Sequence, residues 1–366
     1  MLELLLAGKQ AEVEARVAAL RARPRGEREL VDRVEYEVAR NPAQGITFDS
    51  GGRATVHGDG RTFEGGVFET PSIAELRARQ GGGSSSSRLS VLLGSDPLTD
   101  IGLLQATAAP QTTFQVASQF NCLEAPGEVI VPVYRYFRDP TQGPRAAISA
   151  FPGALVRHYA APGKNGERFE QKEGRELNLL ADALLDTARV QCGYLMSQNI
   201  PDLALAAAAL EQRFESIRVG VHRDVEVVFG ANWDGAVDPG VRITQVCTST
   251  YAGGGYSGNS RIEGDVERIA RSALRAAYLG TFLAARKTVV LTLIGGGVFA
   301  NRHSLIFNSL LWALKERDAI ASRPLDVVLN ARQLDDTITE DWVREEVRAR
   351  SGAMVQVDGG RLRKLF

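Results

Sequence analysis

The apolar and polar positions of the chain repeat one arrangement twice: a buried strand, three consecutive glycines and then a helix. Residues 288–294 are apolar or β-branched throughout, which predicts a strand covered on both faces. Residues 295–297 are all glycine, and apolar residues then recur at helical spacing between Leu305 and Leu314. The same order occurs earlier, with a strand predicted over 241–250, glycines at 253–255 and a helix over 265–287.

Strand and helix patterns alternate across residues 241–350. This alternation predicts right-handed crossovers and a mostly parallel sheet covered by helices. Upstream, residues 114–124 form a strand end that is unusually dense in amides and hydroxyls. The remaining predictions are a strand at 89–93, loops at 134–159, largely helical structure at 172–214, a hairpin or sheet edge at 219–229, a strand at 326–330, a helix at 340–350 and a short tail at 355–357. The fold class is therefore α/β.

The first part of the chain has a different character. Residues 1–79 predict an accessory region of helices plus a β-hairpin that packs on the main domain. Asp59-Gly60 is a strong hairpin turn, and Ser72 with Glu75 can form a capping box at the start of a helix. Residues 80–88 are rich in glycine and serine and predict a flexible linker. Residues 89–366 then form the main domain.

Composition and charge argue against several classes of protein. The formal net charge of −1 argues against a general binder of nucleic acids or membrane surfaces, and no apolar run is long enough to span a bilayer. The three cysteines and four histidines are too scattered for a disulfide framework or a metal motif. We therefore expect a cytoplasmic protein with no metal site, no cofactor and neither nucleic acid nor membrane as a partner.

The two glycine-rich turns are candidate anion sites. A strand that passes through three glycines into a helix leaves backbone N–H groups uncovered at the positive end of the helix dipole, where phosphate binds well. Neither turn is a Walker A loop or a complete dinucleotide fingerprint, so a tight turn that simply needs glycine is the alternative. Because both turns follow parallel strands, they should lie at the same sheet edge, where such sheets bind their ligands. Together they favour a phosphate-ester ligand.

At this point the motifs resemble a known family. Residues 251–258 and 293–301 resemble the two ADP-ribose loops of macrodomains, most closely the poly(ADP-ribose) glycohydrolase-like branch and bacterial-effector macrodomains that remove ADP-ribose from arginine. Residues 114–124 are similar to a signature of a macrodomain-like group, and the match spans residues 90–335. The resemblance implies a three-layer α/β/α macrodomain-like fold, with the pyrophosphate on the second loop and the distal ribose near the first. Candidate ligand-binding residues are Gln119, Asn121, Gly253, Gly254, Gly255, Tyr256, Gly295, Gly296, Gly297, Val298, Phe299 and Asn301.

Several of these residues also have an ordinary structural explanation. Gln119 and Asn121 can equally be satisfied amides at a strand end, and Phe299 can be a core residue rather than a wall of the ribose site. Asp96 or Asp100 resembles the early aspartate that holds the adenine amino group in many macrodomains, although turn or cap roles are favoured for both.

The carboxylates after the first glycine loop are the candidate catalysts. Enzymes that degrade poly(ADP-ribose) carry consecutive glutamates there, whereas Glu263, Asp265 and Glu267 are never adjacent. This departure favours the removal of a single ADP-ribose from a side chain. Carboxylates can activate water, protonate the leaving group and offset charge at the anomeric carbon. Glu267 ranks first because it matches a helix-borne glutamate of the resembling group, followed by Asp265 and Glu263. As an alternative, all three only complement the helix dipole.

The leading hypothesis is an ADP-ribosyl hydrolase that removes mono-ADP-ribose from protein side chains by carboxylate-assisted hydrolysis of an N-glycosidic bond. Arginine is the favoured site because a guanidinium leaving group pairs well with a carboxylate. ADP-ribose is then a ligand and product, and the expected partner is an ADP-ribosylated protein. The alternative is a module that binds ADP-ribose or a related nucleotide without catalysis.

Overall fold

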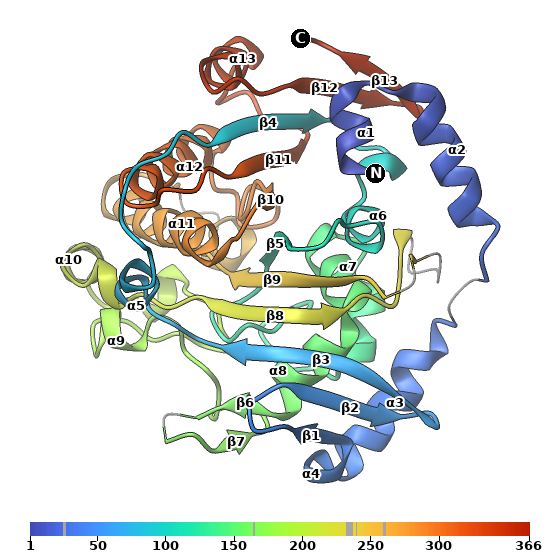
Figure 1. The fold of residues 1–366 in the computed structure, drawn as a ribbon. Helices are drawn as coiled ribbons and strands as arrows, with labels where there is room; N and C mark the ends of the chain where they lie inside the picture. Colours follow the sequence, from blue (N-terminus) through green and yellow to red (C-terminus); the bar gives the residue numbers. More distant parts are fainter. Residues whose placement is uncertain (25–26, 164, 232–236, 239, 259–260) are drawn as a thin grey trace.

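The computed structural model describes residues 1–24, 27–163, 165–231, 237–238, 240–258 and 261–366. Within these residues, eleven strands form one sheet in the order β1-β2-β3-β8-β9-β5-β10-β11-β4-β12-β13 (Figure 1). The strands from β9 to β12 in this order are parallel to one another, whereas β8, β3, β2 and β1 continue the sheet antiparallel at one end and β13 does so at the other. The predicted mostly parallel sheet is confirmed. The strand bounds are β1 Ile46–Phe48, β2 Ala54–Gly58, β3 Arg61–Glu69, β4 Arg88–Leu93, β5 Thr112–Ala117, β8 Gly220–Glu226, β9 Arg242–Thr248, β10 Thr288–Thr292, β11 Asp326–Arg332, β12 Met354–Asp358 and β13 Arg361–Lys364.

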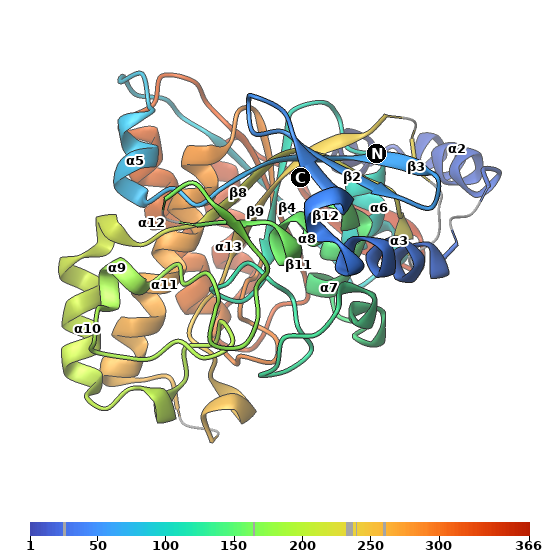
Figure 2. The same cartoon turned by 90° about the horizontal axis from the view of Figure 1, so that it is seen from below.

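Helices cover both faces of this sheet (Figure 2). Alternate residues of a strand point to opposite faces, so in β10 Val289 and Leu291 enter one core and Val290 enters the other. One layer contains α5 (Ile73–Ala78), α10 (Leu203–Gln212), α11 (Gly264–Ala284), α12 (His303–Asp318) and α13 (Glu340–Ala349). The opposite layer contains α1 (Leu2–Ala7), α2 (Gln10–Arg21), α3 (Glu29–Arg40), α6 (Ile101–Ala106), α7 (Gln142–Ser149) and α8 (Phe151–Tyr159). This is the three-layer α/β/α arrangement expected from the sequence.

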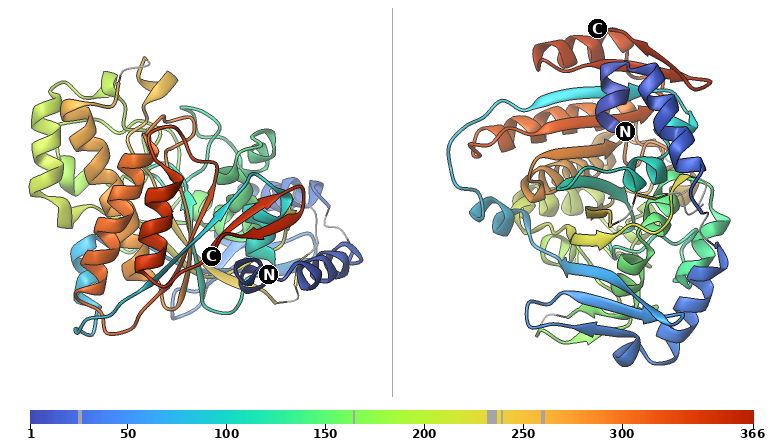
Figure 3. Two further views of the ribbon diagram at one scale, coloured as in Figure 1. Left: turned by 90° about the horizontal axis from the view of Figure 1, so that it is seen from above. Right: turned by 45° about the vertical axis from the view of Figure 1, so that its right-hand side comes forward.

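The two chain ends lie near each other, since α1 packs on β12 and β13 (Figure 3). Within the described part of the chain, no helix has the length and apolar character needed to cross a membrane. The short elements are α4 (Pro42–Gly45), α9 (Ala181–Leu184), the two-stranded pair β6 (Ala161–Pro162) and β7 (Arg168–Phe169), and the 3-10 turns η1 (Pro97–Thr99), η2 (Val133–Arg138), η3 (Ser197–Asn199), η4 (Phe214–Ser216) and η6 (Gly254–Ser257).

The structure corrects four of the local predictions. Residues 134–159, predicted as loops, contain α7 and α8, because Pro144 and Pro152 lie in the first turns of these helices, where proline is tolerated. Residues 172–214 are α-helical only in α9 and α10. Between these helices an irregular chain buries Tyr194 and Met196 in a small cluster with Ala252. The hairpin or sheet edge predicted at 219–229 is the single interior strand β8, which is irregular between His222 and Val225, where Asp224 has φ +58°. The tail at 355–357 is the sheet strand β12.

The N-terminal region continues the main sheet instead of forming a separate layer. The hairpin turn at Asp59-Gly60 is confirmed, with φ values of 54° and 70°, and β3 pairs directly with β8. The capping box is confirmed too: the Glu75 N–H donates to Ser72 Oγ, and the Ser72 N–H donates to the Glu75 carboxylate.

The glycine- and serine-rich segment is docked on α12, in place of the flexible connection that its composition predicts. The Ser87 N–H and hydroxyl both donate to the Asp318 carboxylate, at 2.9 and 2.5 Å, and the Ser85 N–H donates to the Asp318 carbonyl. Arg317 lies 3.2 Å and Arg350 3.6 Å from the same carboxylate. A buried, multiply bonded aspartate therefore fixes the entry of the chain into β4.

Replacing this aspartate tests the docking. We expect Asp318→Ala to lower the free energy of unfolding by about 3 kcal/mol, because it leaves the buried Ser87 N–H without its acceptor and removes the carboxylate that faces Arg317 and Arg350. The matched control is Asp326→Ala, which removes only an exposed ion pair with Arg88 and should cost about 0–1 kcal/mol. Urea denaturation measures both. Equal small losses would show that the segment contributes nothing to stability.

Candidate functional site

At the carboxyl end of β5, neighbouring strands connect to helices on opposite faces of the sheet. In the sheet β5 lies between β9 and β10. The chain leaves β5 toward α7 and α8 in one helical layer, whereas it leaves β9 and β10 toward α11 and α12 in the other. Adjacent parallel strands with connections on opposite faces open a crevice at their carboxyl ends, where ligands of such sheets bind. The two glycine-rich loops and residues 118–124 all lie at this edge, as predicted.

The two glycine-rich loops touch each other backbone to backbone. A Cβ atom placed on Gly253 would lie 2.7 Å from the Phe299 carbonyl oxygen, and one on Gly254 would lie 2.7 Å from the Val298 carbonyl oxygen. Gly254 also has φ +56°, which disfavours any side chain. The glycines of the first loop are thus required by its contact with the second loop, and the two loops form one continuous rim.

Three aromatic rings hold this rim together. Tyr194 stacks on Tyr256 of the first loop with ring centroids 5.0 Å apart, and Phe299 of the second loop meets both rings edge-on at 5.8 and 5.3 Å. The Tyr194 hydroxyl also accepts from the Gln119 side chain at 3.2 Å. Tyr194 therefore links both glycine loops to the end of β5. Phe299 is a partly buried member of this wall, whereas the sequence favoured a core phenylalanine.

The second loop presents unused backbone donors. It is closed by hydrogen bonds from the Ala300 N–H to the Gly297 carbonyl and from the Asn301 N–H to the Gly295 carbonyl, at 2.9 and 3.0 Å. In the part of the chain that the structure describes, the N–H groups of Gly297, Val298 and Phe299 donate to no protein acceptor. Helix α12 starts soon afterwards at His303. Consecutive free N–H groups before a helix N-terminus form an anion-binding nest.

The three glycines of this loop differ in their surroundings. A Cβ on Gly295 would strike the Thr250 hydroxyl at 2.4 Å, and one on Gly296 would strike the His303 ring at 2.5 Å. Gly297 is exposed, and a Cβ there would meet open space. Gly295 and Gly296 are therefore needed by packing, and Gly297 is the position that a ligand can approach. Gly255 in the first loop is exposed and open in the same way.

Three amides predicted to contact the ligand are buried and used within the protein. Asn301 donates to Thr250 Oγ1 and to the carbonyls of Tyr251 and Gly295 at 3.0–3.1 Å, which fixes the second loop. Gln119 bonds both backbone groups of Ala125. Asn121 accepts from Leu123 and donates to Glu176. All three side chains thus make internal hydrogen bonds that shape the site, and their direct contact with a ligand stays a prediction.

The predicted catalytic carboxylates lie at the start of α11, and each has different surroundings. Glu263 is exposed at the N-cap position and makes no side-chain cap bond. Asp265 pairs with Arg268 at 2.7 Å. Glu267 is bonded by both Arg271 and Arg302, and Arg302 directly follows the second glycine loop. Glu267 alone among the three is thus connected to that loop, although two guanidinium groups already occupy its oxygens.

A fourth carboxyl, which the sequence analysis did not select, has no such partner. Glu124 ends the amide-rich stretch after β5 and is only partly exposed. In the described structure its carboxylate makes no hydrogen bond or ion pair. A Cβ on Gly143, at the start of α7, would lie 2.1 Å from Glu124 Oε1, so only glycine leaves room for this carboxyl. Burial, and secondly the charge of Asp139, raise the pKa of the Glu124 carboxyl well above its ordinary value.

Glu124 also lies close to the aromatic wall. Burial first, and then the charges of Tyr256 and Glu124, raise the pKa of the Tyr194 hydroxyl. A partly buried carboxyl with a raised pKa at the carboxyl edge of a parallel sheet is a candidate for proton transfer. One indication of Glu124 is present in the sequence: it is the acidic residue that closes the amide-rich stretch 114–124.

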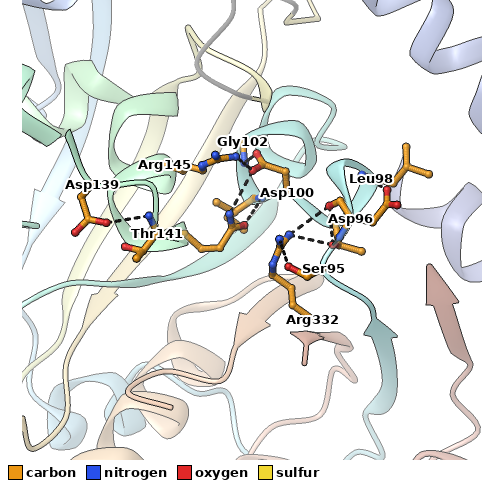
Figure 4. Close-up of polar contacts among 12 residues, drawn as sticks. Ser95, Asp96, Leu98, Asp100, Gly102, Asp139, Thr141, Arg145 and Arg332 are labelled. Carbon is orange, nitrogen blue, oxygen red and sulfur yellow. Dashed lines mark hydrogen bonds and ion pairs between the residues drawn. The ribbon is translucent and has the colours of Figure 1, made fainter. Parts of the chain in front are cut away.

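The early aspartates have structural roles (Figure 4). Asp96 caps η1 by accepting from the Leu98 N–H, and its other oxygen accepts from the Gly360 N–H. Asp100 caps α6 by accepting from the Gly102 N–H and pairs with Arg145. The cap roles favoured by the sequence are confirmed. Arg332 lies between them and donates to Ser95 and Thr99.

The chain is similar to bacterial poly(ADP-ribose) glycohydrolases. The enzyme from Thermomonospora curvata is 15% identical with a TM-score of 0.38, and the alignment covers 88% of this chain and 98% of that one. A structure of the same enzyme bound to the inhibitor ADP-HPD gives the same values. The enzyme from Deinococcus radiodurans in complex with ADP-ribose is 14% identical with a TM-score of 0.38, covering 77% and 93%. No protein-family model and no curated protein sequence match the chain.

The buried Glu124 carboxyl makes stability depend on pH. Its pKa is raised in the folded state, so it favours folding most below about pH 4.5, and this contribution is lost as the pH rises through the raised pKa. Glu124→Gln keeps the shape and stays neutral. We expect it to raise the melting temperature at pH 8 by on the order of 2 °C and to have little effect at pH 4. Exposed Glu128→Gln is the control, and identical shifts at both pH values in Glu124→Gln would contradict the assignment.

Proposed function

We propose that this protein is an ADP-ribosyl hydrolase of the glycosidase type that removes ADP-ribose from modified protein side chains, with arginine as the favoured attachment site. One observation carries the proposal: the free N–H groups of Gly297, Val298 and Phe299 lie on the rim that the two glycine loops form together. The resemblance of both loops to ADP-ribose loops supports the identity of the ligand.

The rim suggests how ADP-ribose would bind. The N–H groups of the second loop would hold the pyrophosphate, because they face open space in front of the α12 N-terminus. The distal ribose would then lie toward the first loop, against the wall of Tyr256 and Phe299. Gly255 leaves that side open. This pose directs the anomeric carbon toward the end of β5, where the loop with Glu124 begins.

Hydrolysis at that carbon needs one proton donor and one acceptor. In our proposal the neutral carboxyl donates its proton to the leaving nitrogen while the C–N bond breaks, and water adds to the anomeric carbon. The carboxylate that results then takes the proton that the water loses. Glu124 suits this cycle because burial keeps its proton in place and no guanidinium occupies it. Glu267, ranked first from the sequence, is the alternative, with Asp265 and Glu263 behind it.

Arginine as the attachment site rests on leaving-group chemistry. A guanidinium can form two parallel hydrogen bonds with a carboxylate, so a site rich in carboxylates favours it over other side chains. Glu263 lies at the start of α11 after the first loop and can supply this pairing from the protein surface, whereas Asp265 is already paired with Arg268. The separation of these carboxylates is the reason for favouring single ADP-ribose units over the polymer.

Activity on a defined substrate distinguishes the candidate catalysts. The substrate is a peptide ADP-ribosylated on arginine, compared with one modified on serine and with poly(ADP-ribose), and the readout is free ADP-ribose. We expect release from the arginine peptide, a loss of about 10²–10⁴-fold in Glu124→Gln, and a loss below tenfold in Glu267→Gln. The reverse order would assign catalysis to Glu267. Binding of ADP-ribose without release from any substrate would mean that the protein is a binding module.

Substitution at Gly297 tests the anion nest. Gly297 has no positive φ, and a Cβ there meets no protein atom, so Gly297→Val should fold normally. Its side chain would fill the space in front of the free N–H groups, and we expect the affinity for ADP-ribose to fall at least about tenfold in calorimetry. Gly81→Val, at another open glycine without positive φ, is the matched control and should bind like the wild type. Unchanged affinity in Gly297→Val would reject the nest.

A further inference from the structure

A hollow lined by cationic side chains lies beside the second glycine loop. It is a cavity of about 670 Å³ between α11, α12 and α13, here called the α11–α12 groove. Arg302 lies at its rim immediately after the loop, and Glu267 lies at the start of α11 on the same side. The groove is outside the rim that the glycine loops form, and apart from Glu267, the alternative catalyst, the proposed function uses none of its lining residues.

The groove concentrates positive charge on a chain whose formal net charge is −1. Two carboxylates line it, Glu267 and Glu346, and the former is already shared between two guanidinium groups. The cationic side chains that line it are Arg271, Arg275, Arg302, Lys315 and Arg350. Glu267 pairs with Arg271 and Arg302, and Asp318 pairs with Arg350. Arg275 and Lys315 remain without an ion pair in the described part of the chain, and their charge favours an anionic occupant.

The Arg275 guanidinium has no ion-pair partner among the described residues of the groove. Its guanidinium lies over the Trp312 ring, 4.6 Å from the ring centre. Its Nε atom is buried and has no hydrogen-bond partner, and within the described residues Arg275 makes no ion pair. Burial, and secondly the charge of Arg271 one turn away, lower the pKa of Arg275. Lys315, one turn after Trp312, is exposed and likewise has no ion pair in the described part of the chain.

We infer that the α11–α12 groove is a binding site for a phosphate group of a small anionic ligand. Phosphate oxygens accept several charge-assisted hydrogen bonds at once, which guanidinium and ammonium groups supply from different directions. Such an anion offsets the repulsion between Arg271 and Arg275 and gives Arg275 the acceptors that it lacks. The phosphate belongs either to the ligand in the nest, as a further group on it, or to a separate molecule. The inference is independent of the proposed function.

Fluorescence of Trp312 reports on binding directly. Inorganic pyrophosphate is titrated into the full chain, and we expect a saturable change in tryptophan emission because the anion contacts the cation stacked on the indole. Arg275→Gln and Lys315→Gln should each weaken binding about tenfold, the usual effect of one lost charge-assisted contact. Trp312→Phe should lose the signal. Lys287→Gln is the matched control, since this exposed lysine lies at the opposite end of β10.

The outcomes separate this groove from the nest. Gly297→Val should leave the fluorescence titration unchanged, whereas disappearance of the signal in Gly297→Val alone would overturn the inference. Unchanged binding in both Arg275→Gln and Lys315→Gln would overturn it as well. If Arg275→Gln proves unstable by melting temperature, exposed Lys315→Gln decides the question by itself.

The same titration identifies the source of the phosphate. It is repeated in the presence of saturating ADP-ribose. Unchanged affinity for pyrophosphate would show that the groove takes the phosphate of a separate molecule. Competition that Lys315→Gln relieves would show that one ligand spans the nest and the groove. Either result supports the groove as an anion site, and both stand even if no ADP-ribose is ever released by the protein.

Discussion

The close approach of two backbone loops is the constraint on which the candidate site depends. Gly253 and Gly254 allow the carbonyls of Phe299 and Val298 to come nearer than any side chain would permit. Because a trans peptide points its C=O and N–H in opposite directions, the Val298 carbonyl that faces the first loop leaves the Phe299 N–H facing away from that loop. The aromatic wall then fixes the pair of loops to β5. The nest is a consequence of packing, and it exists before any ligand arrives.

Local patterns predicted the parts of the site, and long-range pairing assembled them. A strand, three glycines and a helix are visible in the sequence because hydrophobic period and glycine content are local properties. Parallel strands placed both loops at one edge by a general rule. The position of β5 between β9 and β10 was not predictable, because register such as Thr113 opposite Thr244 joins residues far apart in the chain. The helices α7 and α8 were missed because proline and glycine in a first turn resemble a loop.

The candidate catalytic carboxylates show the same difference between local pattern and long-range contact. Glu263, Asp265 and Glu267 were chosen from sequence proximity to a glycine loop, yet arginines occupy Asp265 and Glu267 in the folded chain. Glu124 is distinctive only through what surrounds it: a helix start that needs glycine, a lack of partners and partial burial. No spacing rule encodes such an environment. Gln119 and Asn121 likewise fit the alternative of satisfied amides, which depends on partners up to 75 residues away.

The order of strands also determines where a fragment that keeps the candidate site must begin. A fragment that begins near β9 would keep both glycine loops, the acidic start of α11 and the cationic groove. It would lack β5, however, and β9 and β10 pair with β5 and not with each other. The two loops would then be carried by strands with an unfilled gap between them. A search for a minimal active fragment should therefore start upstream of β5 rather than at the motifs themselves.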